Sequence, residues 1–190
     1  GNTLLTAEFR PPEGAVLDCD KVKCNFIATM CGWQPKPLQR IKMEQDFENL
    51  IHCEWSIREE DNSNYNCIAW SVGETDAVYW MNPVDSPRGD GDSVIEVSDF
   101  DALYDYYNFT TTSDINEATI ILYKNTGKAS PSNPDGITHA ARKLQGCSCG
   151  AGKWIMFESK LGPTERIEHR RDQLNGTNYG EPFRYYKPKP

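Results

Sequence analysis

The stretch Asn64-Tyr65-Asn66-Cys67-Ile68-Ala69-Trp70-Ser71-Val72-Gly73 decides how the rest of the chain is interpreted. Polar loop and capping residues precede Cys67 and apolar residues follow it, which predicts that a short buried helix begins at the cysteine. Gly73 is expected to end that helix after one or two turns. Free N–H groups and the dipole at a helix start lower a thiol pKa, so Cys67 is a candidate nucleophile. The alternative is that Cys67 is simply a small residue of the core.

Composition narrows the class of partner. The 190 residues suit one domain of ordinary size. Asp and Glu outnumber Lys and Arg 28 to 20, giving a net charge of −8, which disfavours binding to the phosphates of nucleic acid. The apolar runs are far shorter than the roughly 20 residues that a transmembrane helix needs. We therefore expect neither a nucleic-acid nor a membrane partner.

Seven cysteines are many for a reduced protein of this length, and the odd number suggests disulfides plus one free thiol. Six lie in loop-like segments typical of disulfides: Cys19, Cys24, Cys31, Cys53, Cys147 and Cys149. With two glycosylation sequons, at Asn108 and Asn175, they favour a secreted or periplasm-delivered protein. Four of them could instead form a zinc knuckle, but their spacings depart from the usual Cys-x2-Cys hairpins. We predict no metal and no cofactor.

The pattern along the chain divides it into three parts. Residues 1–60 are expected to form an irregular, disulfide-stapled N-terminal extension with one helix within 38–51. Residues 61–186 are expected to form the catalytic domain, and 187–190 a tail. In that domain, periodicity predicts a helix from 98 to about 108, a buried strand at 118–123, an antiparallel pair at 136–144 and 153–160, and a closing strand at 179–186.

A cysteine nucleophile needs a base, and imidazole suits that task near neutral pH. His139 lies at the start of a predicted strand after a flexible loop, where a sheet could hold it rigidly while it faces a cleft. His169 lies in a charged segment that suggests a turn, so we assign it only a supporting role. His139 is the preferred base, and a structural histidine at a sheet end is the alternative.

The order of a helix-borne cysteine, a helix, a strand-borne histidine and a neighbouring strand resembles the papain-like superfamily that includes NlpC/P60 and CHAP cysteine amidases. Asn66-Cys67-Ile68-Ala69-Trp70, Thr138-His139-Ala140-Ala141 and the strand 154–160 carry the resemblance. With Ser159-Lys160-Leu161-Gly162, Arg166-Ile167-Glu168-His169 and Tyr179-Gly180, the set is most similar to an uncharacterised bacterial and fungal domain family. The resemblance spans about residues 65–186. It implies an α+β papain-like (NlpC/P60-like) fold, with the Cys67 helix packed on an antiparallel sheet that carries His139.

The group that orients His139 is left open. Glu158 and Ser159 are the polar residues on the following strand, and they face opposite sides of it, so only one can point inward. A carboxylate would stabilise imidazolium, which favours Glu158, whereas the family-like block favours Ser159. His169 is a third candidate. Asn66 or the backbone N–H of Cys67 could stabilise an oxyanion, at about 3 kcal/mol per donor.

These features predict a cysteine-dependent peptidase or amidase. Cys67 would attack an amide of a peptide or protein substrate, including peptidoglycan peptides, and His139 would transfer the proton. A secreted toxin or effector domain, with an inhibitor or immunity protein as partner, fits the disulfides. The same pair could serve a glutamine deamidase or transglutaminase. The rival from another class is a secreted, disulfide-stabilised binding module without catalysis.

Overall fold

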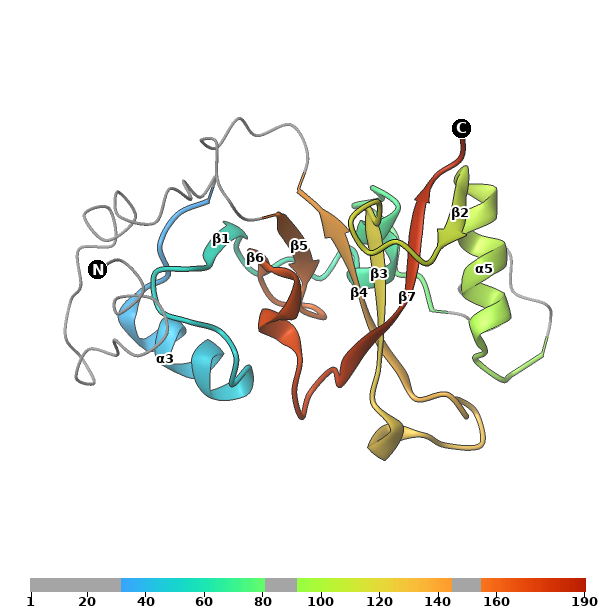
Figure 1. Cartoon of the computed structure of the whole chain (residues 1–190). Coiled ribbons are helices and arrows are strands. Elements are labelled where there is room, and N and C mark those ends of the chain that lie inside the picture. The colour runs from blue at the N-terminus through green and yellow to red at the C-terminus, as the bar shows by residue number, and fades with distance from the viewer. Residues whose placement is uncertain (1–31, 81–91, 145–154) are drawn as a thin grey trace.

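The computed structural model describes residues 32–80, 92–144 and 155–190 of the chain (Figure 1). The α-helices are α3 (Pro37–Asp46), α4 (Cys67–Ser71) and α5 (Val97–Tyr106), and the 3-10 helices are η1 (Thr126–Lys128) and η2 (Arg171–Leu174). The strands are β1 (Ser56–Glu59), β2 (Phe109–Thr112), β3 (Ile120–Lys124), β4 (Ile137–Lys143), β5 (Met156–Lys160), β6 (Arg166–Arg170) and β7 (Glu181–Pro188). Five of the cysteines expected in disulfides lie outside the described residues: Cys19, Cys24, Cys31, Cys147 and Cys149.

The seven strands form one sheet in the order β1-β6-β5-β4-β3-β7-β2, and every neighbouring pair is antiparallel. Figure 1 shows α3 beside the β1 end of the sheet and α5 beside the β2 end. The predicted antiparallel pair is confirmed, but β4 and β5 pair at only two positions, Arg142 with Glu158 and Lys143 with Phe157. Toward His139 the two strands are therefore not joined by a ladder.

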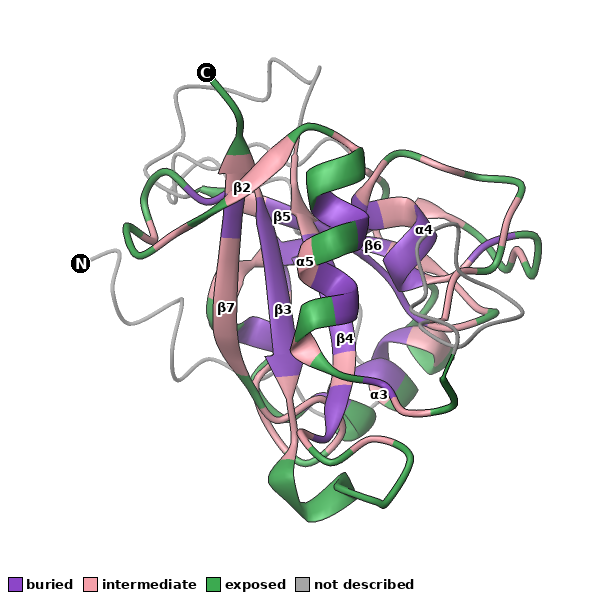
Figure 2. Cartoon of the chain, turned by 90° about the vertical axis from the view of Figure 1, so that its right-hand side faces the viewer, coloured by how far each residue is buried: buried purple, intermediate pink, exposed green. Residues whose placement is uncertain are grey.

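Two apolar clusters cover the two faces of the sheet. The α3 face carries a cluster that includes Met43, Leu50, Ile121, Tyr123 and Phe157. The α4 face carries one that includes Cys67, Ile68, Phe100, Ile120, Leu122 and Ala140, beneath α4 and α5. Because alternate residues of β3 enter different clusters, this strand is buried on both sides, as its continuous apolar run predicts. Figure 2 shows β3 and β4 buried behind α5.

The expected papain-like α+β fold is wrong. The described chain is dominated by one seven-stranded antiparallel sheet, and its α-helices contain only ten, five and ten residues. The helix at Cys67 is short because Gly73 follows it with φ of +89°, which favours glycine, and a Cβ there would lie 2.8 Å from an Arg142 nitrogen. Charged segments such as Arg166–Arg170 also pair into the sheet, where a turn was expected.

The region expected to be a separate N-terminal extension contributes to the same core. Met43 of α3 lies in the α3-face cluster together with Trp55 and Ile57, and β1 pairs with β6. The boundary expected at residue 61 therefore does not coincide with a break in packing among the described residues. None of the helices in the described part of the chain has the length and apolar character that crossing a bilayer would require.

Candidate functional site

Cys67 begins α4, as the sequence predicts, and Asn66 caps the helix by accepting a hydrogen bond from the Ala69 N–H at 3.0 Å. The same oxygen accepts from the Tyr79 N–H at 3.1 Å, and the Asn66 side-chain nitrogen donates to the Tyr79 carbonyl at 2.6 Å. The amide that was considered for oxyanion stabilisation is thus occupied by the helix start and by Tyr79. The backbone N–H of Cys67 is the remaining candidate for that role.

Cys67 is a free cysteine with 7% of its surface exposed, whereas Cys53 is disulfide-bonded, so the free thiol and the disulfide are confirmed at these two positions. Burial raises the pKa of the Cys67 thiol to about 11, although the backbone N–H groups of Ala140 and Ile68 favour the thiolate. The expected lowering of this pKa is therefore wrong, because loss of solvent outweighs the N–H groups at the helix start. The resting thiol is protonated at neutral pH.

His139 is the end of a buried chain of three polar side chains. Its Nε2 lies 2.8 Å from the Ser159 hydroxyl oxygen, which lies 2.8 Å from Nε2 of His169. His169 Nδ1 lies 2.7 Å from the Arg170 carbonyl oxygen, which can only accept, so Nδ1 carries the proton. Ser159 then donates to His169 Nε2 and accepts from His139 Nε2. His139 Nδ1 is left without a proton, and without a hydrogen-bond partner among the described residues.

Both imidazoles are held neutral. Burial lowers the pKa of His139 well below its usual value, and the nearby His169 lowers it further. Burial likewise lowers the pKa of His169 to about 4, although the Arg170 carbonyl partly offsets this effect. The His139 ring also stacks on Tyr179, with centroids 4.0 Å apart and planes 3° from parallel. Together these contacts fix the position of the ring and its tautomer.

The structure brings Ser159, and not Glu158, to His139. Glu158 points to the α4 face, where its oxygens lie 3.1 Å from Arg58 Nε and 3.5 Å from Arg166 Nε. Burial raises the pKa of Glu158, and the two guanidinium groups oppose that rise. Of the candidates that were left open, Ser159 contacts His139 directly, and His169 contacts Ser159 but not His139.

Cys67 and His139 approach β4 from opposite faces. The thiol belongs to the α4-face cluster with Ala140, whereas the neighbouring His139 projects toward Tyr123 and Tyr179 on the α3 face. Burial raises the pKa of Tyr179, and negative charge on Cys67 raises it further. The thiol therefore has an electrostatic effect on a residue across the strand.

Sequence reasoning missed Lys160 and Tyr179 as neighbours of the thiol and the imidazole. Lys160 is fully buried and is one of the charges that favour the Cys67 thiolate. A lysine at the end of a strand normally suggests an exposed position, so only its place in the Ser159-Lys160-Leu161-Gly162 block could have pointed to it. Tyr179 lies in the Tyr179-Gly180 block, but nothing local predicts its contact with His139, which joins residues forty apart in the chain.

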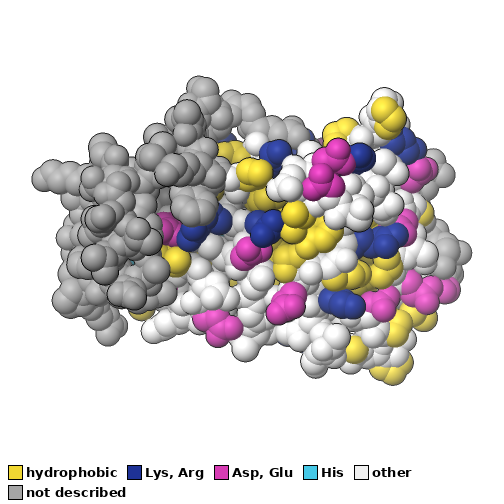
Figure 3. Space-filling view, in the orientation of Figure 1, with side chains coloured by type: hydrophobic (Ala, Val, Ile, Leu, Met, Phe, Trp, Pro, Cys, Tyr) yellow, Lys and Arg dark blue, Asp and Glu magenta, His cyan; other side chains and the backbone are white. Residues whose placement is uncertain are grey.

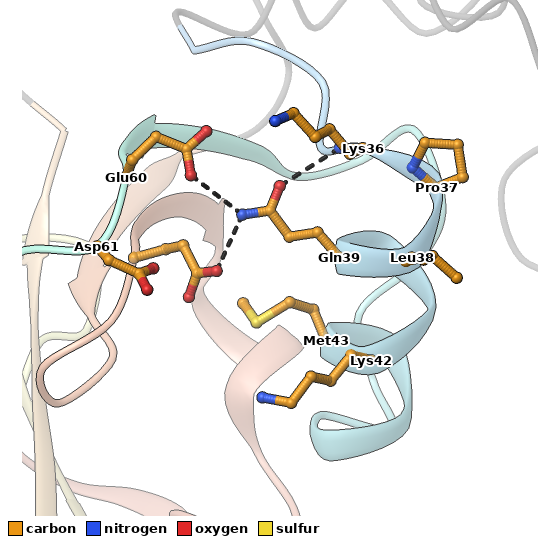
Figure 4. Close-up of a pocket in the computed structure, with 9 residues that line it drawn as sticks. Lys36, Pro37, Leu38, Gln39, Lys42, Met43, Glu60 and Asp61 are labelled. Atoms are coloured by element: carbon orange, nitrogen blue, oxygen red, sulfur yellow. Dashed lines mark hydrogen bonds between the residues drawn. The ribbon is translucent and has the colours of Figure 1, made fainter.

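A separate acidic group lines a surface hollow of about 800 Å³ beside α3 (Figure 4). Oxygens of Glu60, Asp61 and Glu165 lie within 4.8 Å of one another and could in principle hold a cation. The Gln39 side-chain nitrogen already donates to Glu60 at 3.3 Å and to Glu165 at 2.9 Å. Glu60 and Asp61 are exposed, and such groups are common on acidic surfaces.

The surface in Figure 3 carries acidic and basic side chains interspersed with hydrophobic ones, and no histidine is visible on its described part. This agrees with the complete burial of His139 and His169. The buried chain is thus part of the interior of the sheet and not of an open surface.

The fold and site together define an antiparallel sheet protein with a free, buried thiol on one face of the sheet and a buried histidine chain on the other. A profile described as "Domain of unknown function (DUF7689)" matches residues 56–187, from β1 to the end of β7. The chain belongs to the DUF7689 family. Comparison with curated proteins and with solved structures gave no match.

Proposed function

We propose that this chain is a cysteine-dependent amide hydrolase that uses Cys67 as nucleophile and His139 as general base. The observation that carries the proposal is the buried histidine chain, which holds His139 by Nε2 and leaves Nδ1 free to accept a proton. The adjacent residue, Ala140, offers its N–H to the Cys67 thiol. A base of fixed tautomer that can reach a free thiol is the arrangement that activates a cysteine.

The raised pKa of Cys67 and the lowered pKa of His139 define the resting pair as neutral. The thiol proton would pass to His139 Nδ1 as sulfur attacks the amide carbonyl carbon, and the C=O electrons would move onto oxygen. Collapse of this adduct breaks the C–N bond, and the amine leaves with the proton from Nδ1. Water then hydrolyses the thioester with His139 again as base, which releases the acid and restores the thiol. Because the two groups approach β4 from opposite faces, this transfer requires a movement that brings Sγ of Cys67 and Nδ1 of His139 together.

The substrate class proposed is a peptide or protein amide, with peptidoglycan peptides included. The disulfide at Cys53 supports secretion or delivery to the periplasm, because disulfides persist in oxidising compartments. An effector with a cognate inhibitor is consistent with this placement.

The test combines turnover with labelling. Denatured casein and peptidoglycan peptides are incubated with the protein, and new termini are mapped by mass spectrometry, with Cys67→Ser as the blank. In parallel, iodoacetamide labelling of Cys67 is followed from about pH 6 to 10 in the native protein and in His139→Ala. We expect Cys67-dependent cleavage and a loss of labelling in His139→Ala.

His52→Ala is the matched control, since His52 lies against Glu44 and not in the histidine chain. Ser159→Ala is the milder second variant if His139→Ala does not fold. Unchanged Cys67 labelling in folded His139→Ala and Ser159→Ala would refute the activated pair. Together with an absence of cleavage, that result would favour the binding module.

A further inference from the structure

Two Asn-x-Thr sequons lie outside the proposed chemistry, Asn108-Phe109-Thr110 and Asn175-Gly176-Thr177. A sequon of this kind is the acceptor of an N-linked glycan in a secreted protein, and the bulky, hydrophilic glycan requires a position at the surface. The structure places the two asparagines in different surroundings, which distinguishes the two acceptors.

Asn108 lies in the turn between α5 and β2. Its φ of +64° falls in the left-handed region, which asparagine adopts more readily than most other residues. Its backbone N–H donates to the Asp105 carbonyl at 3.1 Å, and its carbonyl accepts from the Lys189 N–H at 2.8 Å. The residue is exposed, and no hydrogen bond joins its side chain to another of the described residues. The turn is therefore fixed by the backbone, and the side-chain amide is accessible from solvent.

The position of this turn leaves room for a large group. β2 is the last strand of the sheet and pairs only with β7 among the described strands. Figure 1 shows α5 and β2 together at the end of the molecule that lies opposite α3. Thr110, whose hydroxyl completes the sequon, lies within β2 opposite Lys187. A glycan on Asn108 would thus extend from the end of the sheet without displacing a core residue.

Asn175 has a different environment, in the loop after η2. Its Oδ1 is buried and has no hydrogen-bond partner among the described residues, so its side-chain amide is turned inward. Asn49 Nδ2 donates to the Asn175 carbonyl at 2.8 Å. A Cβ at Gly176 would lie 2.5 Å from Glu48 Oε1, which shows how closely the loop packs on the segment after α3. A glycan on Asn175 would have to open this packing.

We propose that Asn108 is an N-glycosylation site of the secreted protein and that Asn175 is not. The co-reactant is an oligosaccharide linked to a lipid through a diphosphate. Nδ2 of Asn108 forms a bond to C1 of the first sugar, and the bond from C1 to the diphosphate oxygen breaks. The electron pair of that bond leaves with the lipid diphosphate, and the amide loses one proton to a base.

This inference rests on the proposed secretion and not on the chemistry of Cys67. Glycosylation of Asn108 and hydrolysis by Cys67 therefore fail separately. Iodoacetamide labelling of Cys67 should be the same in the glycosylated protein and in Asn108→Gln, because the sequon lies in the turn after α5 and the thiol at the start of α4.

The experiment secretes the chain from yeast, whose secretory pathway forms disulfides and attaches N-linked glycans. The folded protein is treated with an N-glycosidase, which converts a modified asparagine to aspartate, and peptide mass spectrometry locates the change. Asn108→Gln removes the acceptor. Thr110→Val removes only the hydroxyl of the sequon and keeps a β-branched residue in β2. Asn175→Gln is the matched control.

We expect a glycan on Asn108 and its complete loss in both Asn108→Gln and Thr110→Val. Asn175→Gln should leave the occupancy of Asn108 unchanged. An unmodified Asn108 in the secreted, folded protein would overturn the inference, and so would equal occupancy of Asn108 and Asn175.

Discussion

Glu158 and Ser159 are neighbours on β5, and the two faces of the sheet use them in opposite ways. On the α3 face, Ser159 joins two neutral histidines in a chain without formal charge. On the α4 face, Glu158 lies between two guanidinium groups. The comparison shows that one strand can separate a neutral proton acceptor from a charged network by a single peptide unit, because successive side chains alternate.

The largest expected effect on stability comes from removing the Glu158 carboxylate on the α4 face. Glu158→Ala leaves Arg58 and Arg166 without their shared carboxylate in a mostly buried site, which should lower the free energy of unfolding by about 4 kcal/mol. Chemical denaturation measures the change. Glu117→Ala is the control, because its pair with Lys187 is exposed and should cost less than about 1 kcal/mol. Equal losses in the two variants would contradict the distinction.

On the α3 face, the stability contributed by the neutral histidine His169 should decrease in acid. His169 binds a proton near its ordinary pKa of 6.5 when unfolded but only near about 4 when folded. Its contribution to stability is therefore complete above pH 6.5 and is lost as the pH falls toward 4, by about 3 kcal/mol in all. Unfolding curves over this range measure the slope. His169→Gln should reduce it, and a native slope in His169→Gln would show that other groups control it.

Ser159→Ala tests the centre of the histidine chain. Removing the hydroxyl leaves Nε2 of both histidines buried without a partner, so we expect a loss of about 2 kcal/mol in thermal or chemical unfolding. Ser71→Ala is a matched control on the other face, because the Ser71 hydroxyl is also buried and bonds the Ile68 carbonyl and the Tyr104 hydroxyl. Only Ser159→Ala should also change Cys67 labelling, and an equal change in Ser71→Ala would argue against a specific chain.

The smallest effect concerns the start of α4. Asn66→Ala removes the helix cap and the link to Tyr79, and caps of this kind contribute about 1 kcal/mol. Thermal unfolding measures the loss. Asn125→Ala, which removes the side-chain cap of η1 at Gly127, is a control away from the thiol. Iodoacetamide should label Cys67 faster in Asn66→Ala than in Asn125→Ala. Equal rates would show that the Asn66 cap does not hold Cys67 in its position.

The sequence was sufficient for elements whose signals are local. The polar-to-apolar change at Asn66 and Cys67 predicts α4, and the apolar run from Ile120 predicts β3. It was insufficient for β6, because Arg166, Glu168 and His169 suggest a solvated turn. Glu168 and His169 are buried by partners outside this segment, such as Ser56 for Glu168 and Ser159 for His169. The same limit left Ser159 and Glu158 undecided, since their directions depend on where β4 lies.

The histidine chain has a direction, and that direction limits what it can do. It ends at the carbonyl oxygen of Arg170, a group that has no proton to give and does not retain one at ordinary pH. A proton that arrives on Nδ1 of His139 can be relayed through the Ser159 hydroxyl as far as Nε2 of His169, and no further. The chain therefore retains the proton on its two imidazoles until a leaving group at Nδ1 of His139 takes it back.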